Sequence, residues 1–275
     1  MDCVGMRGWR LMGAGVLGCV GVLIGAWTLS AEGGGTNPSP SRLVVEPPME
    51  LVMAGRHVYE RQCLVCHGKW GDGRGEMATG MVPRPRRLTS GVFKYRSTPV
   101  GFLPTDADLE RTIRTGVAGS SMPSFAGLPD RDIRAVIGYV KTLSTRWKRP
   151  ANYAPEVRLP PVPGWMEDPV GRVPHEKRGA ELFAGLCAPC HGPGAAGDGS
   201  AGAKLEDVWG DPIRPADLRL PLARSGPGAV DLFRTVTTGL DGTPMAGFGD
   251  SVPELDRWAL VAYIRARKSE YREGR

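Results

Sequence analysis

Residues 63–67 have the sequence CLVCH and residues 187–191 have CAPCH, so the pattern C-x-x-C-H occurs twice in the chain. On a helical turn, residues i, i+3 and i+4 share one face, so the two thiols and the imidazole of each copy point at one flat object. Thiols can add to the two vinyl groups of haem, and the imidazole can then bind the iron. The pattern predicts two covalently attached haem c groups, held by Cys63, Cys66, His67, Cys187, Cys190 and His191.

Two other kinds of site use a similar cysteine spacing. A thioredoxin-like redox pair has two cysteines at this distance, but it does not need the histidine that follows both copies here. A zinc site needs further cysteines or histidines nearby. The remaining ones in the chain are Cys3, Cys19, His57 and His175. The spacing therefore favours haem over both alternatives.

The sequence around each motif is also duplicated. The segment DLERTIRTGVAGSSM at residues 108–122 recurs as DLFRTVTTGLDGTPM at residues 231–245, with eight identities in fifteen. A GDG tripeptide follows each motif, at residues 71–73 and 197–199. We interpret these repeats as two copies of one domain.

Each copy has the patterns of short helices. Thr105 followed by Asp108 is a capping-box start, and Gly116 predicts the end of the same helix. The later segments carry apolar residues on one helical face. The segments expected to be helical are 56–62, 105–115, 130–143, 177–186 and 253–268. Because no strand pattern of any length is present, the predicted fold class is all-α.

Five regions follow from this order. We expect an N-terminal membrane anchor or signal, a tether, a first haem domain, a Pro-rich linker and a second haem domain. The linker holds seven prolines from Pro150 to Pro174, which predicts a stiff, extended connection. The regions are residues 1–30, 31–50, 51–145, 146–174 and 175–275.

The N-terminal region contains an uncharged run of 19 residues, 11–29, after Arg7 and Arg10. As a helix it would be about 28 Å long, close to the thickness of a bilayer core. This length favours an uncleaved transmembrane helix over a removed signal peptide, and lipid attachment at Cys19 is a third interpretation. All three export the chain, which predicts a position on the periplasmic side of the bacterial inner membrane, or in the periplasm after cleavage.

Composition and charge exclude some classes of protein. Of the 275 residues 41% are hydrophobic, which excludes disorder over the whole chain. The net charge of +6 is concentrated in residues 51–145, with 14 Lys and Arg against 8 Asp and Glu. No aromatic interleaving or recognition-helix pattern accompanies these charges, so nucleic acid is not the expected partner. We expect a protein partner that docks on the basic half.

Two methionines occupy equivalent positions in the repeat. Met122 follows His67 by 55 residues, and Met245 follows His191 by 54. A thioether is a soft, neutral iron ligand that raises the potential of haem, although methionine also serves as core filler. Five others have no such counterpart: Met49, Met53, Met77, Met81 and Met166. We predict Met122 and Met245 as the second axial ligands.

The region from about residue 52 to 268 resembles two tandem class I c-type cytochromes, in its order of C-x-x-C-H, GDG loop, helix, methionine loop and last helix. Residues 93–113, FKYRSTPVGFLPTDADLERTI, also resemble cytochrome subunits of periplasmic oxidoreductases and respiratory complexes. The resemblance implies that the first and last helices of each domain cross. It places Tyr59 near Tyr139, and Phe183 near Tyr263.

The resemblance also implies that a proline carbonyl orients each iron-binding histidine, with Pro83 or Pro85 and Pro212 or Pro215 as candidates. Four side chains of the first half are candidates to hold haem propionates. An equally good interpretation is that they belong to a basic loop exposed to solvent. These are Trp70, Arg86, Tyr95 and Arg96.

The function predicted from these observations is one-electron transfer between redox proteins, through two haems with His and Met ligands and without a small-molecule substrate. The protein would be a carrier, not an enzyme, or else the cytochrome subunit of a larger oxidoreductase. The alternatives are a di-haem peroxidase, which needs an open iron and a nearby acid or base, and a haem-based sensor.

Overall fold

The computed structural model describes residues 46–220, 224, 226 and 228–273. The predicted anchor or signal at residues 11–29 lies outside this part of the chain. Among the helices that the structure describes, none is both long enough and apolar enough to cross a membrane.

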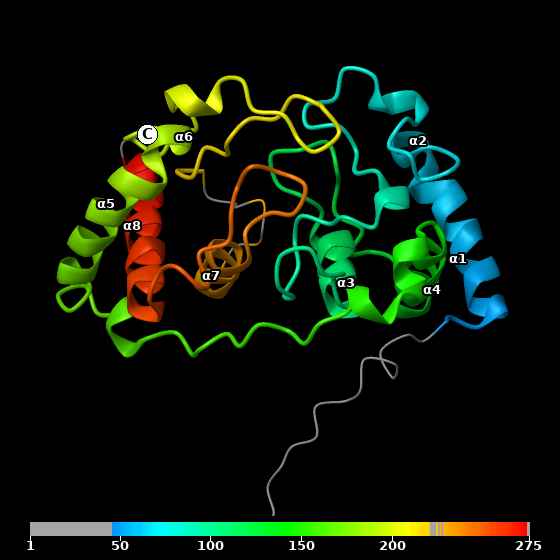
Figure 1. Ribbon diagram of the computed structural model, residues 1–275, viewed down its shortest axis with the longest axis horizontal. Coiled ribbons are helices and arrows are strands. Elements are labelled where there is room, and N and C mark those ends of the chain that lie inside the picture. The colour runs from blue at the N-terminus through cyan, green and yellow to red at the C-terminus, as the bar shows by residue number, and fades with distance from the viewer. Residues whose placement is uncertain (1–45, 221–223, 225, 227, 274–275) are drawn as a thin grey trace, which may run out of the picture. The chain divides into compact units, whose positions relative to one another are not determined.

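In the part of the chain that the structure describes, each copy of the repeat (called a half below) contains four helices in the same order (Figure 1). In the first half these are α1 (Met49–Gln62), α2 (Leu64–His67), α3 (Asp106–Thr115) and α4 (Asp130–Thr142). In the second half they are α5 (Val173–Leu186), α6 (Ala188–His191), α7 (Ala229–Thr238) and α8 (Glu254–Glu273). Six 3₁₀ turns lie between them: η2 (Glu76–Ala78), η3 (Leu88–Ser90), η4 (Thr145–Lys148), η5 (Pro150–Asn152), η6 (Gly164–Met166) and η7 (Ser200–Gly202). The described residues form no strand, and the all-α prediction is confirmed.

The start of α3 follows the predicted capping box. The Thr105 hydroxyl accepts a hydrogen bond from the Asp108 amide, and the Asp108 carboxylate accepts one from the Thr105 amide. The helix ends at Thr115, and Gly116 takes a left-handed φ of 65°. In α7, Asp231 has the role of Asp108, because its carboxylate accepts a hydrogen bond from the Gly228 amide.

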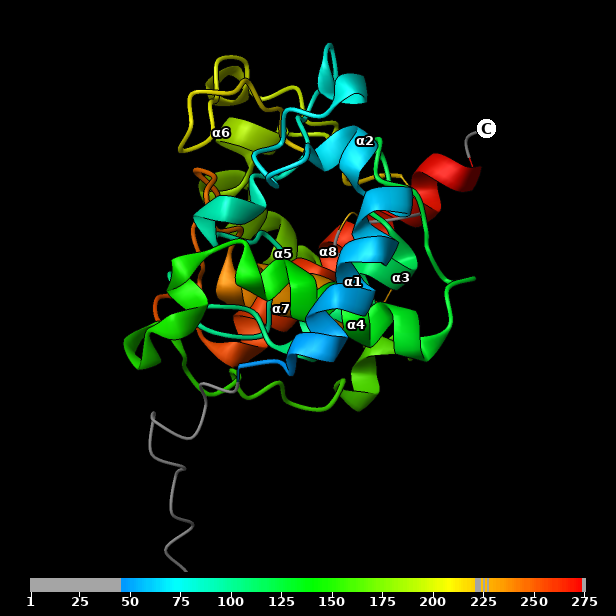
Figure 2. The same ribbon diagram turned by 90° about the vertical axis from the view of Figure 1, so that its right-hand side faces the viewer.

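The first and last helices of each half pack side by side, α1 on α4 and α5 on α8 (Figures 1 and 2). A glycine permits this approach. A Cβ atom on Gly55 would lie 1.9 Å from the carbonyl oxygen of Ala135, and one on Gly179 would lie 2.1 Å from that of Ala259. Both distances are far inside van der Waals contact, so the helices cross closely only because no side chain is present there.

An aromatic pair lies beside each crossing. The rings of Tyr59 and Tyr139 are 5.1 Å apart, and those of Phe183 and Tyr263 are 5.0 Å apart. Both pairs were expected from the resemblance, and both are confirmed. In the first half, Tyr59 also donates a hydrogen bond to the carbonyl oxygen of Gly68, directly after α2.

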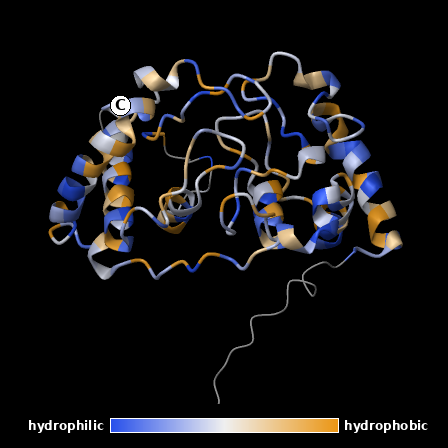
Figure 3. Ribbon diagram, in the orientation of Figure 1, coloured by the Kyte–Doolittle hydropathy of each residue, from blue (hydrophilic) through white to orange (hydrophobic). Residues whose placement is uncertain are grey.

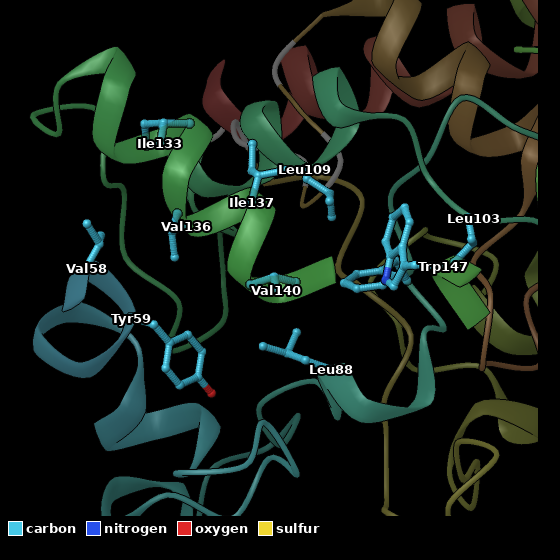
Figure 4. Close-up of a cluster of buried hydrophobic side chains, with 11 residues drawn as sticks. Val58, Tyr59, Leu88, Leu103, Leu109, Ile133, Val136, Ile137, Val140 and Trp147 are labelled. Carbon is cyan, nitrogen blue, oxygen red and sulfur yellow. The ribbon is translucent and has the colours of Figure 1, made fainter. Parts of the chain in front are cut away.

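Each half has its own apolar core. Figure 4 shows the core of the first half, where side chains from α1 and α4 meet Leu88 and Trp147. In the second half, Trp258 on α8 stacks on Phe233 of α7 at 4.2 Å. The long helices carry both hydrophobic and hydrophilic residues, as Figure 3 shows, because one side of each helix faces a core.

The segment expected to be an extended linker contains short turns. The 3₁₀ turn η5 begins with Pro150, a position where proline is tolerated because its missing N–H has no helical partner. The segment also bonds to the first half, since Leu103 donates its amide to Asn152 and Val157 donates to Ser97. Helix α5 begins at Val173, inside the expected linker.

A buried ion pair joins the two halves. The Arg96 side chain is fully buried, and its Nη2 lies 3.2 Å from a carboxylate oxygen of Asp241. The same nitrogen donates to the carbonyl oxygen of Thr238 at 3.0 Å. The Asp241 carboxylate also accepts a hydrogen bond from the Gly101 amide. These contacts give both charges protein partners, as a buried pair requires.

The helix crossing predicts opposite effects for two substitutions on α5. Gly179→Ala places a methyl group against the backbone of Ala259, and we expect it to lower the free energy of unfolding by about 2 kcal/mol or more. A Cβ on Gly185 meets no atom within 4 Å, so Gly185→Ala should raise it by about 0.5 kcal/mol through helix propensity. Denaturant unfolding of the full-length protein measures both changes in free energy. Equal stabilities would contradict the close crossing.

The buried ion pair predicts a non-additive pair of substitutions. Arg96→Met leaves the Asp241 carboxylate without its cation, and we expect a loss of about 3 kcal/mol in the free energy of unfolding. Adding Asp241→Asn removes the stranded charge and should restore part of that loss. Urea titrations of the wild type, both single variants and the double variant measure the coupling. Additive losses would show that the pair does not act as a unit.

Candidate functional site

The two C-x-x-C-H motifs have the same backbone geometry. Cys63 and Cys187 follow directly on α1 and α5, and each donates its amide to the preceding turn of the long helix, at 2.8 and 2.9 Å. The amides of His67 and His191 donate hydrogen bonds of 2.8 Å to the carbonyl oxygens of Cys63 and Cys187, respectively. Each motif is thus a single helical turn, which brings its two thiols and its imidazole onto one side. All four motif cysteines are free.

Burial affects the first thiol of each motif. It raises the pKa of Cys63 and that of Cys187 to about 11, with a smaller contribution from the second cysteine of each motif. These sulfurs therefore remain neutral thiols at neutral pH, in surroundings that suit an apolar ring better than a hydrated ion.

Each histidine is oriented by a backbone carbonyl. The Nδ1 atom of His67 lies 3.0 Å from the carbonyl oxygen of Arg86, and that of His191 lies 3.2 Å from that of Ala216. The expectation that a proline carbonyl would do this is wrong by one residue, because the acceptors directly follow Pro85 and Pro215. A carbonyl group is common to every residue, so the sequence around the prolines does not distinguish the acceptor.

The same hydrogen bond determines the tautomer of each imidazole ring. Burial lowers the pKa of both His67 and His191, which keeps the imidazoles neutral. A neutral ring that donates from Nδ1 to a carbonyl has its lone pair on Nε2. This is the arrangement of a histidine that binds a metal through Nε2.

The predicted methionines lie in loops with matching hydrogen bonds. The carbonyl oxygen of Met122 accepts from the Val117 amide at 3.1 Å, and that of Met245 accepts from the Leu240 amide at 3.0 Å. The Met122 amide donates to a serine hydroxyl and the Met245 amide to a threonine hydroxyl, each two residues earlier.

Glycines at the helix ends let these loops fold back. Gly116 and Gly239 follow α3 and α7 with φ values of 65° and 62°. A Cβ on either would lie 2.7 Å from the carbonyl oxygen of the methionine in its own half. The close return of the methionine loop onto the helix end therefore requires glycine at this position.

In the second half, a cavity of about 530 Å³ brings the predicted residues together. Cys187, Cys190, His191 and Met245 all line it, and apolar side chains such as Leu232 and Phe248 make up much of the wall. The volume lies within the range of about 300–1,000 Å³ that is usual for cofactor sites. Size, apolar lining and donor atoms all fit a haem.

The other candidate side chains of the first half have different surroundings. Trp70 is 68% exposed, with the Lys69 ammonium over its ring. Arg96 is used in the ion pair between the halves. The Arg86 guanidinium stacks on Trp209 of the second half. Tyr95 lines the second-half cavity beside Lys94, a residue that no motif in the sequence marks.

A solved structure supports this architecture. The chain is similar to a protein in "Kuenenia stuttgartiensis reducing HAO-like protein complex Kustc0457/Kustc0458", with 33% sequence identity and a TM-score of 0.74. The alignment covers 81% of this chain and 99% of that chain.

A family match covers both halves. The family described as "Cytochrome C oxidase, cbb3-type, subunit III" matches residues 50–140 and again residues 174–264, so each copy of the repeat is one cytochrome c domain. The match implies haem c binding and supports a role in electron transfer. On this evidence the chain belongs to the cbb3-type cytochrome c oxidase subunit III family, as two tandem class I cytochrome c domains.

Proposed function

We propose that the protein is a di-haem electron carrier, in which each half holds one haem between a histidine and a methionine. The observation that carries this proposal is the duplication of the whole ligand set. His67 and His191 have the same carbonyl hydrogen bond, and Met122 and Met245 lie in loops with the same backbone contacts. Two irons with both axial positions filled suit electron transfer rather than substrate chemistry.

The roles of the chain's residues follow from this geometry. A haem bound in either half supplies one reversible electron through its ferric and ferrous states. The cysteines attach it, the Nδ1–carbonyl hydrogen bond keeps the imidazole neutral and oriented, and the methionine favours the ferrous form. The chain takes one electron from a donor protein and gives one to an acceptor protein, with no bond made or broken.

Location and partners are part of the proposal. The uncharged run at residues 11–29 supports export to the periplasmic side of the inner membrane, either anchored or released after cleavage. The similar chain belongs to a multi-protein complex, which supports a role as the cytochrome subunit of a larger oxidoreductase. Redox proteins, rather than nucleic acid or a small-molecule substrate, are then the partners.

Carbon monoxide distinguishes a carrier from an enzyme or a sensor. We expect the native protein to carry two covalent haems per chain and, after reduction, to bind no carbon monoxide, because both axial positions are filled. Met122→Ala and Met245→Ala should each open one iron and bind one carbon monoxide per chain. Visible absorption spectra with and without the gas measure this.

A matched control is available in Met77, whose side chain is 56% exposed. Met77→Ala removes a thioether of the same half as Met122 and should leave the spectrum unchanged and insensitive to carbon monoxide. Binding of the gas by the native protein would mean an open iron and would favour the peroxidase or sensor alternative.

The basic first half predicts a dependence of electron transfer on salt. Residues 51–145 carry 14 Lys and Arg against 8 Asp and Glu, so this half should attract a negatively charged partner. We expect the rate of reduction by the hexacyanoferrate(II) anion to fall about tenfold as the Debye length shrinks from about 30 Å to about 3 Å between 0.01 and 1 M salt. Stopped-flow absorbance measures the rate, and a positively charged cobalt(II) complex, also used as a reductant, is the control, since its rate of haem reduction should rise with salt. A flat dependence for both reagents would contradict docking by charge.

A further inference from the structure

The cavity of the second half has a wall that belongs to the first half. Its lining includes Pro83, Lys94, Tyr95, Ala118 and Gly119, besides the second motif and Met245. The two halves are held in this arrangement by the buried contacts of Arg96. The haem site of the second half is therefore not complete within its own domain.

The polar groups on this wall belong to a cluster of positive charge. Lys94 and Arg224 both line the cavity, and Arg86 lies close enough to lower the pKa of Lys94. Burial is the largest cause of that shift, which brings the Lys94 pKa to about 8, while Asp207 opposes it. Among the residues that the structure describes, no carboxylate forms an ion pair with Lys94 or Arg224.

The carboxylates nearest to this cluster are Asp207, Asp211 and Asp241, which act on Arg86, and the latter two are in ion pairs with other arginines. Half-buried cations without an ion-pair partner lose hydration and repel one another, so an anion inside the cavity would stabilise Lys94 and Arg224. Haem carries two carboxylate side chains, the propionates, and the two thiols and the imidazole of the second motif commit this cavity to haem. A propionate is thus an anion that belongs in the same cavity.

We propose that the first half completes the haem site of the second half, with the Lys94 ammonium and the Tyr95 hydroxyl donating hydrogen bonds to propionates of the haem attached at Cys187 and Cys190. A charge-assisted bond of this kind is stronger than a neutral one. The inference rests on the proposed function only in taking haem as the occupant, and it does not depend on the axial ligand.

The effect on the haem follows from charge. Without Lys94, an uncompensated propionate stabilises the ferric over the ferrous state of the second-half haem, so its potential falls. We expect Lys94→Gln to change the ratio of ferrous to ferric second-half haem about tenfold at a fixed solution potential, which is about 59 mV for one electron. Tyr95→Phe, which removes only a neutral donor, should change it about threefold.

The measurement uses the full haem-loaded chain. Redox titrations followed by NMR of the haem methyl groups give the two potentials separately, and contacts of those methyl groups with Leu232 and Phe248 identify the second-half haem. Lys148→Gln is the control, since it makes the same charge change at an exposed position of the first half. It should leave the second-half ratio within about twofold of the wild type.

A fall confined to the second-half haem in Lys94→Gln, with two covalent haems per chain retained, supports the proposal. A shift of the first-half haem instead, or no shift of either, overturns it. If Lys94→Gln loses the second haem, Lys94→Arg decides: retention of both haems with a near-native potential supports the cation's role, and loss overturns it. Carbon monoxide binding by the native protein would refute the axial methionines and leave this test unchanged.

Discussion

The long helices of each half cross at a glycine, Gly55 or Gly179, where even a methyl group would collide with the opposing backbone. The crossing fixes the direction in which α1 and α5 end. Since the C-x-x-C-H turn follows directly on each of these helices, it also fixes the side to which the thiols and the imidazole point. The aromatic pairs and the two apolar cores are arranged around this contact. The loops add the carbonyl oxygens that orient the two histidines, those of Arg86 and Ala216.

The two halves share the geometry of their candidate ligands but not their surroundings. The hydrogen bonds of the histidines and of the methionine loops are nearly the same in both. The second-half cavity, however, has Lys94 and Tyr95 of the other half in its wall. Charge and solvent exposure set the potential of a haem with given ligands. If both halves bind haem as proposed, the duplication gives two haems with the same kind of ligands in unequal electrostatic environments.

Much of this arrangement could be predicted from the sequence, because it depends on side-chain chemistry at fixed spacing. The two motifs, the all-α class and the capping box at Thr105 belong to this group, whereas the aromatic pair of Tyr59 and Tyr139 was expected only from the resemblance to class I cytochromes. The histidine acceptors were missed by one residue, because a carbonyl has no side-chain signature. The partners of Arg96 were missed for another reason: Asp241 lies 145 residues away, and no local pattern relates the two. The axial roles of Met122 and Met245 stay predictions.

Arg86 belongs to both halves at once. Its carbonyl oxygen accepts the hydrogen bond from His67, while its guanidinium stacks on Trp209 of the second half at 4.5 Å. In the second half the same position is Ala216, whose methyl group is too short to reach across in return. A displacement of the second half would therefore act on the residue whose carbonyl orients the first histidine, whereas Ala216 makes no equivalent stacking contact for the second histidine. The orientation of the first histidine and the position of the second half are therefore coupled through a single residue, and this coupling acts equally in both directions.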